Sequence, residues 1–214
     1  MEPLSEHAKQ LFAERLSQYG TKLEDLKDNI NTAEVAAKKN AAAGTEVTTG
    51  HPEGGADLPG KVRDVKDIDE MKKYGGVPDS DFTERGLSDA HVHYPDAPKA
   101  EDLAAVENAK GDVCHLTDNL SAHAHQNLRK ASQAYVLGHS EKVKAWKPIL
   151  DMADFPAQGT IVDHGDLVVD PRHPLKIVGP GPVTYNAKSI TVKPGGQIIT
   201  ETDVTFNVGS MIVE

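Results

Sequence analysis

Three aligned repeats near the C-terminal end are the feature that most constrains the fold of this chain. They begin at Thr160, Val183 and Val204, and they align with one another without gaps. One aligned column holds Val162, Tyr185 and Phe206, and the next holds Asp163, Asn186 and Asn207. Two later columns are also apolar, and in the third repeat they hold Met211 and Val213. Such short repeats bury their apolar face only against neighbouring repeats, so they predict stacked strands.

The repeats predict a short β-solenoid, a coil similar to a parallel β-helix, over residues 159–214. Stacking would place Asn186 and Asn207 in one column, where their amides could form a side-chain ladder that begins at Asp163. The alternative is a small antiparallel β-sandwich or jelly roll, in which Gly195-Gly196 would form a hairpin turn.

The remainder of the chain predicts helices, so the expected fold class is α+β. Apolar residues spaced three and four apart predict a helical N-terminal arm over residues 1–40. Residues 41–98 are rich in Gly and Pro and are expected to form a linker and an irregular segment. A second helical region is expected over residues 99–158, followed by the β-repeat domain over residues 159–214.

The third repeat has no successor in the sequence, which suggests how the chain would assemble. A strand at the end of a stack exposes unpaired backbone groups that can pair with another chain. We expect the surface of this repeat to be completed by another copy of the chain, with a trimer as the first arrangement to test. The assembly residues would be Val204, Phe206, Met211 and Val213, together with the predicted ladder.

Composition excludes several classes of partner. The chain has 33 acidic and 23 basic residues and a formal net charge of −10, which argues against binding nucleic acid or anionic membranes. The single cysteine, Cys114, excludes an intramolecular disulfide and is typical of a reducing compartment. The N-terminal residues lack the features of a secretory signal, and no apolar run is long enough for membrane insertion. We expect a cytoplasmic protein as synthesised, and export without a cleaved signal or incorporation into a particle stays open.

A histidine-containing motif is the strongest candidate for chemistry. On a strand, residues two apart point to the same side, so His91 and His93, with Asp89, could bind a divalent transition metal such as zinc. The segment from Gly86 to His93 resembles the Asp-x-His-x-His motif that begins the amidohydrolase superfamily. That resemblance implies a metal-dependent hydrolase built on a (β/α)₈ barrel of about 250 residues. The residues after His93 lack the alternating strands and helices of such a barrel.

These observations lead to two functional hypotheses. The first is a non-catalytic structural or binding protein that self-assembles through its C-terminal repeats, contacts a polysaccharide or a protein partner, and needs no cofactor. The alternative is a metal-dependent enzyme or metal-binding protein that uses His91 and His93.

Overall fold

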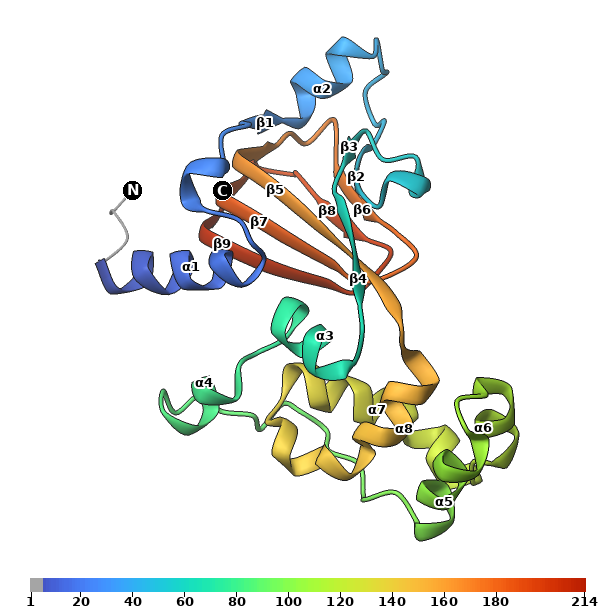
Figure 1. Cartoon of the computed structure of the whole chain (residues 1–214). Coiled ribbons are helices and arrows are strands. Elements are labelled where there is room, and N and C mark those ends of the chain that lie inside the picture. Colours follow the sequence, from blue (N-terminus) through green and yellow to red (C-terminus); the bar gives the residue numbers. More distant parts are fainter. Residues whose placement is uncertain (1–5) are drawn as a thin grey trace. The chain divides into compact units, whose positions relative to one another are not determined.

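The protein divides into two compact units. The computed structural model describes residues 6–214, shown in Figure 1. The described residues up to Arg63 and the segment Gln158–Glu214 form one unit, here called the sheet unit. The segment Asp64–Ala157 forms the other, here called the helical unit.

The sheet unit combines segments from both ends of the chain. Its helices are α1 (Glu6–Gln18) and α2 (Thr32–Lys38), with 3₁₀ turns η1 (Leu23–Asp25) and η2 (Pro52–Gly54). The early strands are β1 (Ile30–Asn31), β2 (Val47–Gly50), β3 (Leu58–Pro59) and β4 (Lys61–Val65). The later strands are β5 (Ala157–Val169), β6 (Leu175–Val178), β7 (Val183–Val192), β8 (Ile198–Thr200) and β9 (Val204–Val213).

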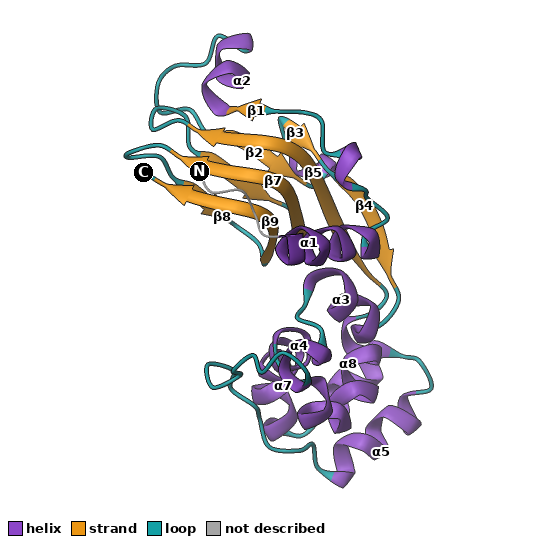
Figure 2. Ribbon diagram, turned by 90° about the vertical axis from the view of Figure 1, so that its left-hand side faces the viewer, coloured by secondary structure: helices purple, strands orange, loops and turns teal. Residues whose placement is uncertain are grey.

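These strands, orange in Figure 2, form two parallel sheets. Sheet A has the order β1-β5-β7-β9, with β4 also pairing with β5, and sheet B has the order β3-β2-β6-β8. From β5 to β9, successive strands therefore alternate between sheet A and sheet B. In sheet A, Val162 lies opposite Tyr185 and Tyr185 lies opposite Phe206.

The predictions of a β-solenoid and of an antiparallel sandwich or jelly roll are both wrong. β5, β7 and β9 each continue as one long strand instead of dividing into the separate short strands that a coil requires. Segments from the N-terminal part of the chain complete both sheets: β2 pairs with β6, and β1 pairs with β5. The antiparallel alternative fails because β7 pairs in parallel with both of its neighbours. The repeats are thus part of a larger two-sheet unit.

The core of the sheet unit is apolar and draws on both sheets. Leu167, Tyr185 and Ile190 from sheet A and Leu175 and Ile177 from sheet B are completely buried in one cluster. Burying these side chains removes apolar surface from water, which stabilises the fold by about 25 cal/mol for each Å² buried. The last strands contribute Ile198, Val204, Phe206 and Val208, which are only partly buried against this cluster.

The helical unit is built from short helices around a separate core. They are α3 (Ile68–Gly75), α4 (Asp79–Thr83), α5 (Ala100–Ala109), α6 (Val113–Asn119), α7 (Ala122–Leu137), η3 (Ser140–Trp146) and α8 (Lys147–Asp154). Side-chain caps fix several starts; the hydroxyl of Ser121, for example, accepts from the backbone N–H of Ala124 at the start of α7. Trp146, Ile149, Leu150 and Leu116 are completely buried in the core.

A buried lysine closes the C-terminal end of α7. Lys72 Nζ donates to the carbonyl oxygens of Tyr135 at 3.0 Å and Gly138 at 2.7 Å, and it lies 3.1 Å from Asp79 Oδ1. The last carbonyls of a helix have no partner within the helix, and a cation there also interacts favourably with the helix dipole. Burial lowers the pKa of Lys72, while the Asp79 carboxylate opposes that shift.

Candidate functional site: an open sheet edge and a groove

Strand β9 forms an edge of sheet A. It pairs with β7 on one side, and no other strand in residues 6–214 pairs with its second side. Helix α1 lies beside β9 without adding a strand. The ten residues of β9 include no charged residue and no proline. Two of its apolar side chains are strongly exposed, Met211 at 49% and Val213 at 73%.

The other edges of the two sheets differ from β9. At the opposite side of sheet A, β1 has only two residues, and β4 carries the exposed charged residues Lys61, Arg63 and Asp64. In sheet B, β3 is two residues long and includes Pro59, and β8 is three residues long. Short length, charge and proline are among the means by which proteins prevent an edge from pairing with another chain, and covering the edge with a helix is another. β9 has none of the first three, and helix α1 lies beside it.

An amide ladder crosses sheet A and ends at this edge. Asn207 Nδ2 donates to Asn186 Oδ1 at 3.0 Å, and Asn186 Nδ2 donates to Asp163 Oδ1 at 2.8 Å. Asp163 Oδ2 accepts from Thr21 Oγ1 and from Lys61 Nζ, both at 3.1 Å. Asn186 is completely buried and Asn207 nearly so. Buried polar groups need such partners, because an unsatisfied one costs free energy.

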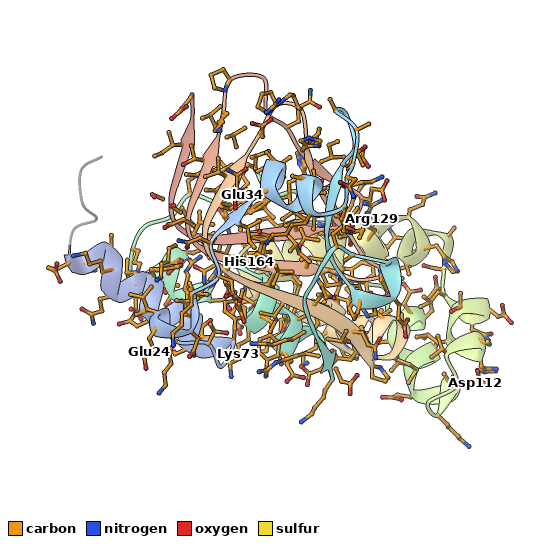
Figure 3. The ribbon with its side chains drawn as sticks, turned by 90° about the horizontal axis from the view of Figure 1, so that it is seen from above. Glu24, Glu34, Lys73, Asp112, Arg129 and His164 are labelled. Atoms are coloured by element: carbon orange, nitrogen blue, oxygen red, sulfur yellow. The ribbon has the colours of Figure 1, made fainter. Side chains whose placement is uncertain are left out.

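On the core side of the same strands, three rings lie in a row from β5 to β9, each tilted relative to the next. The His164 and Tyr185 ring centroids are 5.7 Å apart, and those of Tyr185 and Phe206 are 5.9 Å apart. Figure 3 labels His164 among the strands of the sheet unit. Both His164 nitrogens and the Tyr185 hydroxyl are buried, and none of them has a hydrogen-bond partner among residues 6–214. This column places Phe206, the last ring, at the β9 edge.

Burial controls the ionisation of the first two rings. Desolvation lowers the pKa of His164, although the negative charges of Asp28 and Asp163 act in the opposite direction. Desolvation also raises the pKa of Tyr185. Both rings are therefore kept uncharged in the folded protein near neutral pH, as the apolar surroundings require.

The second candidate site is a groove of about 910 Å³ in the helical unit. One wall is the irregular segment from His91 to Asp96, and the other is α7. Apolar and ring residues of the lining are Val77, Val92, Tyr94, Pro95, Ala134 and Leu137. Its polar lining residues are His91, His93, Asp96, Asn127, Lys130 and Gln133. A groove with an apolar lining and a few polar groups is the usual form of a small-molecule or peptide site.

Hydrogen bonds hold the irregular wall in place at both ends. The Tyr94 hydroxyl donates to Asp89 Oδ2 at 2.5 Å and accepts from the backbone N–H of His139 at 2.8 Å. Trp146 Nε1 donates to the Asp96 carbonyl oxygen at 3.0 Å. Burial and the Asp89 hydrogen bond raise the pKa of Tyr94 to about 12, so its hydroxyl keeps its proton at neutral pH.

A lack of side chain at Gly138 lets this wall approach the end of α7. A Cβ at that position would lie 2.6 Å from the Tyr94 hydroxyl and 2.8 Å from Val92 Cγ1. Both contacts are shorter than atoms of these types tolerate. The segment's position therefore depends on a glycine that follows α7.

The structure places the predicted metal ligands on this wall, in an irregular segment and not on a strand. Both histidines are exposed and line the groove. The Asp89 carboxylate instead accepts from Lys142 Nζ at 2.6 Å and from Tyr94. Among the described residues, no three His, Cys, Asp or Glu side chains are grouped so that they could bind one metal ion. A zinc site at His91 and His93 stays a prediction from the sequence.

Sequence reasoning missed Tyr94, Asp96, Lys130 and Gln133 as members of this groove. Pro95 and Pro98, which close the segment after the histidines, were the available signal, because prolines favour an extended segment over a helix. Nothing in the sequence indicated that α7 would face this segment.

Comparisons with known proteins give no identification: no family model matches the chain, and neither a curated protein nor a solved structure shows significant similarity to it. Within residues 6–214, none of the helices has both the length and the apolar character needed to cross a membrane.

Proposed function

We propose that this chain is a structural protein that self-assembles by pairing its β9 edge with β9 of a second copy. The observation that supports the proposal is the ten-residue edge without charge or proline, in a protein whose other sheet edges are short or protected. An identical strand is a suitable partner, because no like charges meet when β9 lies against itself.

An antiparallel arrangement about a two-fold axis gives a specific register. If the axis passes between Val208 and Gly209, Val204 lies opposite Val213 of the second copy, and Phe206 lies opposite Met211 of the second copy. Phe206 and Met211 occupy the same columns as the core residues Tyr185 and Ile190. The pairing would thus bring core-facing positions of both copies together and cover the two strongly exposed side chains. Contacts between a methionine sulfur and an aromatic ring add about 0.3–1.5 kcal/mol.

The backbone directions of β9 agree with this register. Val183 N–H donates to the Asp203 carbonyl, so the N–H of the same peptide, on Val204, points away from β7. Glu214 N–H donates to the Val192 carbonyl. N–H groups of adjacent residues in a strand alternate in direction, so that of Val213 also points away from β7. The alternation between Val204 and Val213 is interrupted near Gly209, which has no partner in β7 although Val208 and Ser210 do. Val204 and Val213 both present backbone groups to the open side, as a hydrogen-bonded antiparallel pair requires.

Light scattering on the full chain tests the proposal. We expect a mass twice that of the 23.0 kDa chain. Met211→Lys and Val213→Lys should each shift the mass toward one chain, because a charge would be placed inside the new interface. Thr200→Lys is the matched control: it adds the same charge at an exposed position of β8 and should leave the dimer unchanged.

Three results would contradict the proposal. One is a single-chain mass for the unmodified protein at concentrations of tens of micromolar. Another is a dimer that Met211→Lys and Val213→Lys leave intact. The third is a trimer, the first arrangement to test from the sequence, because two-fold pairing of β9 joins only two chains.

A further inference from the structure

The groove of the helical unit has unused polar groups of both charges. Lys130 and Asp96 line it, and the side chains of both are without an ion pair or hydrogen bond within residues 6–214. The same is true of the Gln133 amide. The nearby Asp89 and Lys142, in contrast, pair with each other. A cation and an anion left free in one groove favour a ligand that carries both charges.

The irregular wall also has unused backbone groups. The N–H groups of His93 and Tyr94 donate to no carbonyl in the described part of the chain. Pro95 keeps this stretch extended, and the Tyr94 hydroxyl and the Asp96 carbonyl fix its two sides. An extended segment with free N–H groups can pair with another extended chain, which is a common mode of peptide recognition.

The apolar part of the groove fits side chains of such a peptide. Val92, Ala134 and Leu137 are among the lining residues, and Leu137 is 45% exposed although it is a large apolar residue. The volume of about 910 Å³ lies near the upper end of the range for ligand sites, so the groove has room for more than a single amino acid.

We infer that this groove binds a short apolar peptide with free ends, with the carboxylate at Lys130 and the ammonium group at Asp96. Charge-assisted contacts at the two ends fix the direction of the peptide. Its backbone pairs with the N–H of either His93 or Tyr94, because adjacent N–H groups of an extended segment point to opposite sides. This site belongs to the helical unit and does not depend on the pairing of β9.

Calorimetric titration with the dipeptide leucyl-phenylalanine tests the inference. The free dipeptide should bind, and its N-acetylated and C-amidated forms should each bind at least tenfold more weakly. Lys130→Gln should abolish the preference for the free carboxylate over the amide. Asp96→Asn should abolish the preference for the free ammonium group over the acetylated form. Asp96, Lys130 and the control residue Arg129 are exposed, and far-UV circular dichroism checks that each variant is folded.

Arg129→Gln is the matched control. Arg129, labelled in Figure 3, precedes Lys130 on α7 and is exposed. It is not among the residues that line the groove. Its removal should leave the affinity and the preference for free ends unchanged. Three results would overturn the inference: no binding at millimolar dipeptide, equal binding of the free and blocked forms, or an Arg129→Gln effect as large as that of Lys130→Gln.

Discussion

Replacing Asn186 by alanine tests how much the amide ladder contributes to the stability of the sheet unit. Asn186 is completely buried, donates to Asp163 at 2.8 Å and accepts from Asn207 at 3.0 Å. Asn186→Ala removes both bonds and leaves the Asp163 carboxylate and the Asn207 amide without their central partner. Asn186 is the residue of β7 that links the Asp163 carboxylate on β5 to the Asn207 amide on β9.

The expected cost follows from these two losses. A hydrogen bond to a charged group contributes about 1.5–3 kcal/mol, and a buried donor left unsatisfied costs about 1–3 kcal/mol. We therefore expect Asn186→Ala to lower the free energy of unfolding by about 3–5 kcal/mol. Asn207→Ala removes only the last bond of the ladder, and it should cost about 1–2 kcal/mol.

Urea denaturation followed by far-UV circular dichroism measures both values at one protein concentration. The double variant Asn186→Ala/Asn207→Ala completes the comparison, and its cost should be less than the sum of the single costs, because the two residues share a bond. A loss below about 0.5 kcal/mol for Asn186→Ala, or strict additivity of the two changes, would refute the reasoning.

Three further predictions concern other positions. Gly50→Ala should destabilise the protein by more than about 2 kcal/mol in thermal melts, because its Cβ would lie 2.0 Å from the Val178 carbonyl oxygen. The control Gly44→Ala should cost less, because φ is also positive there but no atom lies within 4 Å of the added Cβ. Lys72→Met should cost about 3 kcal/mol in urea melts, since carbonyls at the end of α7 would lose their buried donor. The free energy of unfolding should fall as pH drops below about 6.5, because the unfolded chain protonates His164 more readily than the folded one. His164→Phe should flatten that part of the pH profile.

The sequence predicted the register of sheet A because that register repeats. Columns such as Val162, Tyr185 and Phe206 could be read directly, since parallel strands in register place like residues opposite each other. The shape of the unit could not be read in the same way. β1 has two residues and β3 has two, which is too short for a periodic pattern, yet they and β2 extend the sheets.

The candidate groove was less predictable than the sheet. The alternation of His91 and His93 suggested a strand, but Tyr94 is bonded to Asp89 and His139, and these contacts hold the segment against α7 instead. Bonds between residues 45 positions apart, such as that between Tyr94 and His139, leave no local pattern in a single sequence. The motif was therefore noticed, while its surroundings were not.

The direction of the amide ladder adds a chemical requirement to the proposed pairing of β9. An ionised Asp163 can only accept hydrogen bonds, so Asn186 must turn its Nδ2 toward β5 and its Oδ1 toward β9. Asn207 follows the same direction, because its Nδ2 donates to Asn186. The ladder consequently ends at the open edge with a carbonyl oxygen, and the strand that pairs there should supply a donor. In the antiparallel register proposed above, the residue opposite Asn207 is Ser210 of the second copy, whose hydroxyl can donate to that oxygen.

Ser210→Ala should therefore weaken the dimer by about 0.5–1.5 kcal/mol, measured as the dimer dissociation constant in a light-scattering dilution series. Ser189→Ala is the control: it removes a hydroxyl from β7 and should leave that dissociation constant unchanged. Equal effects of the two changes would show that the ladder does not continue across the interface.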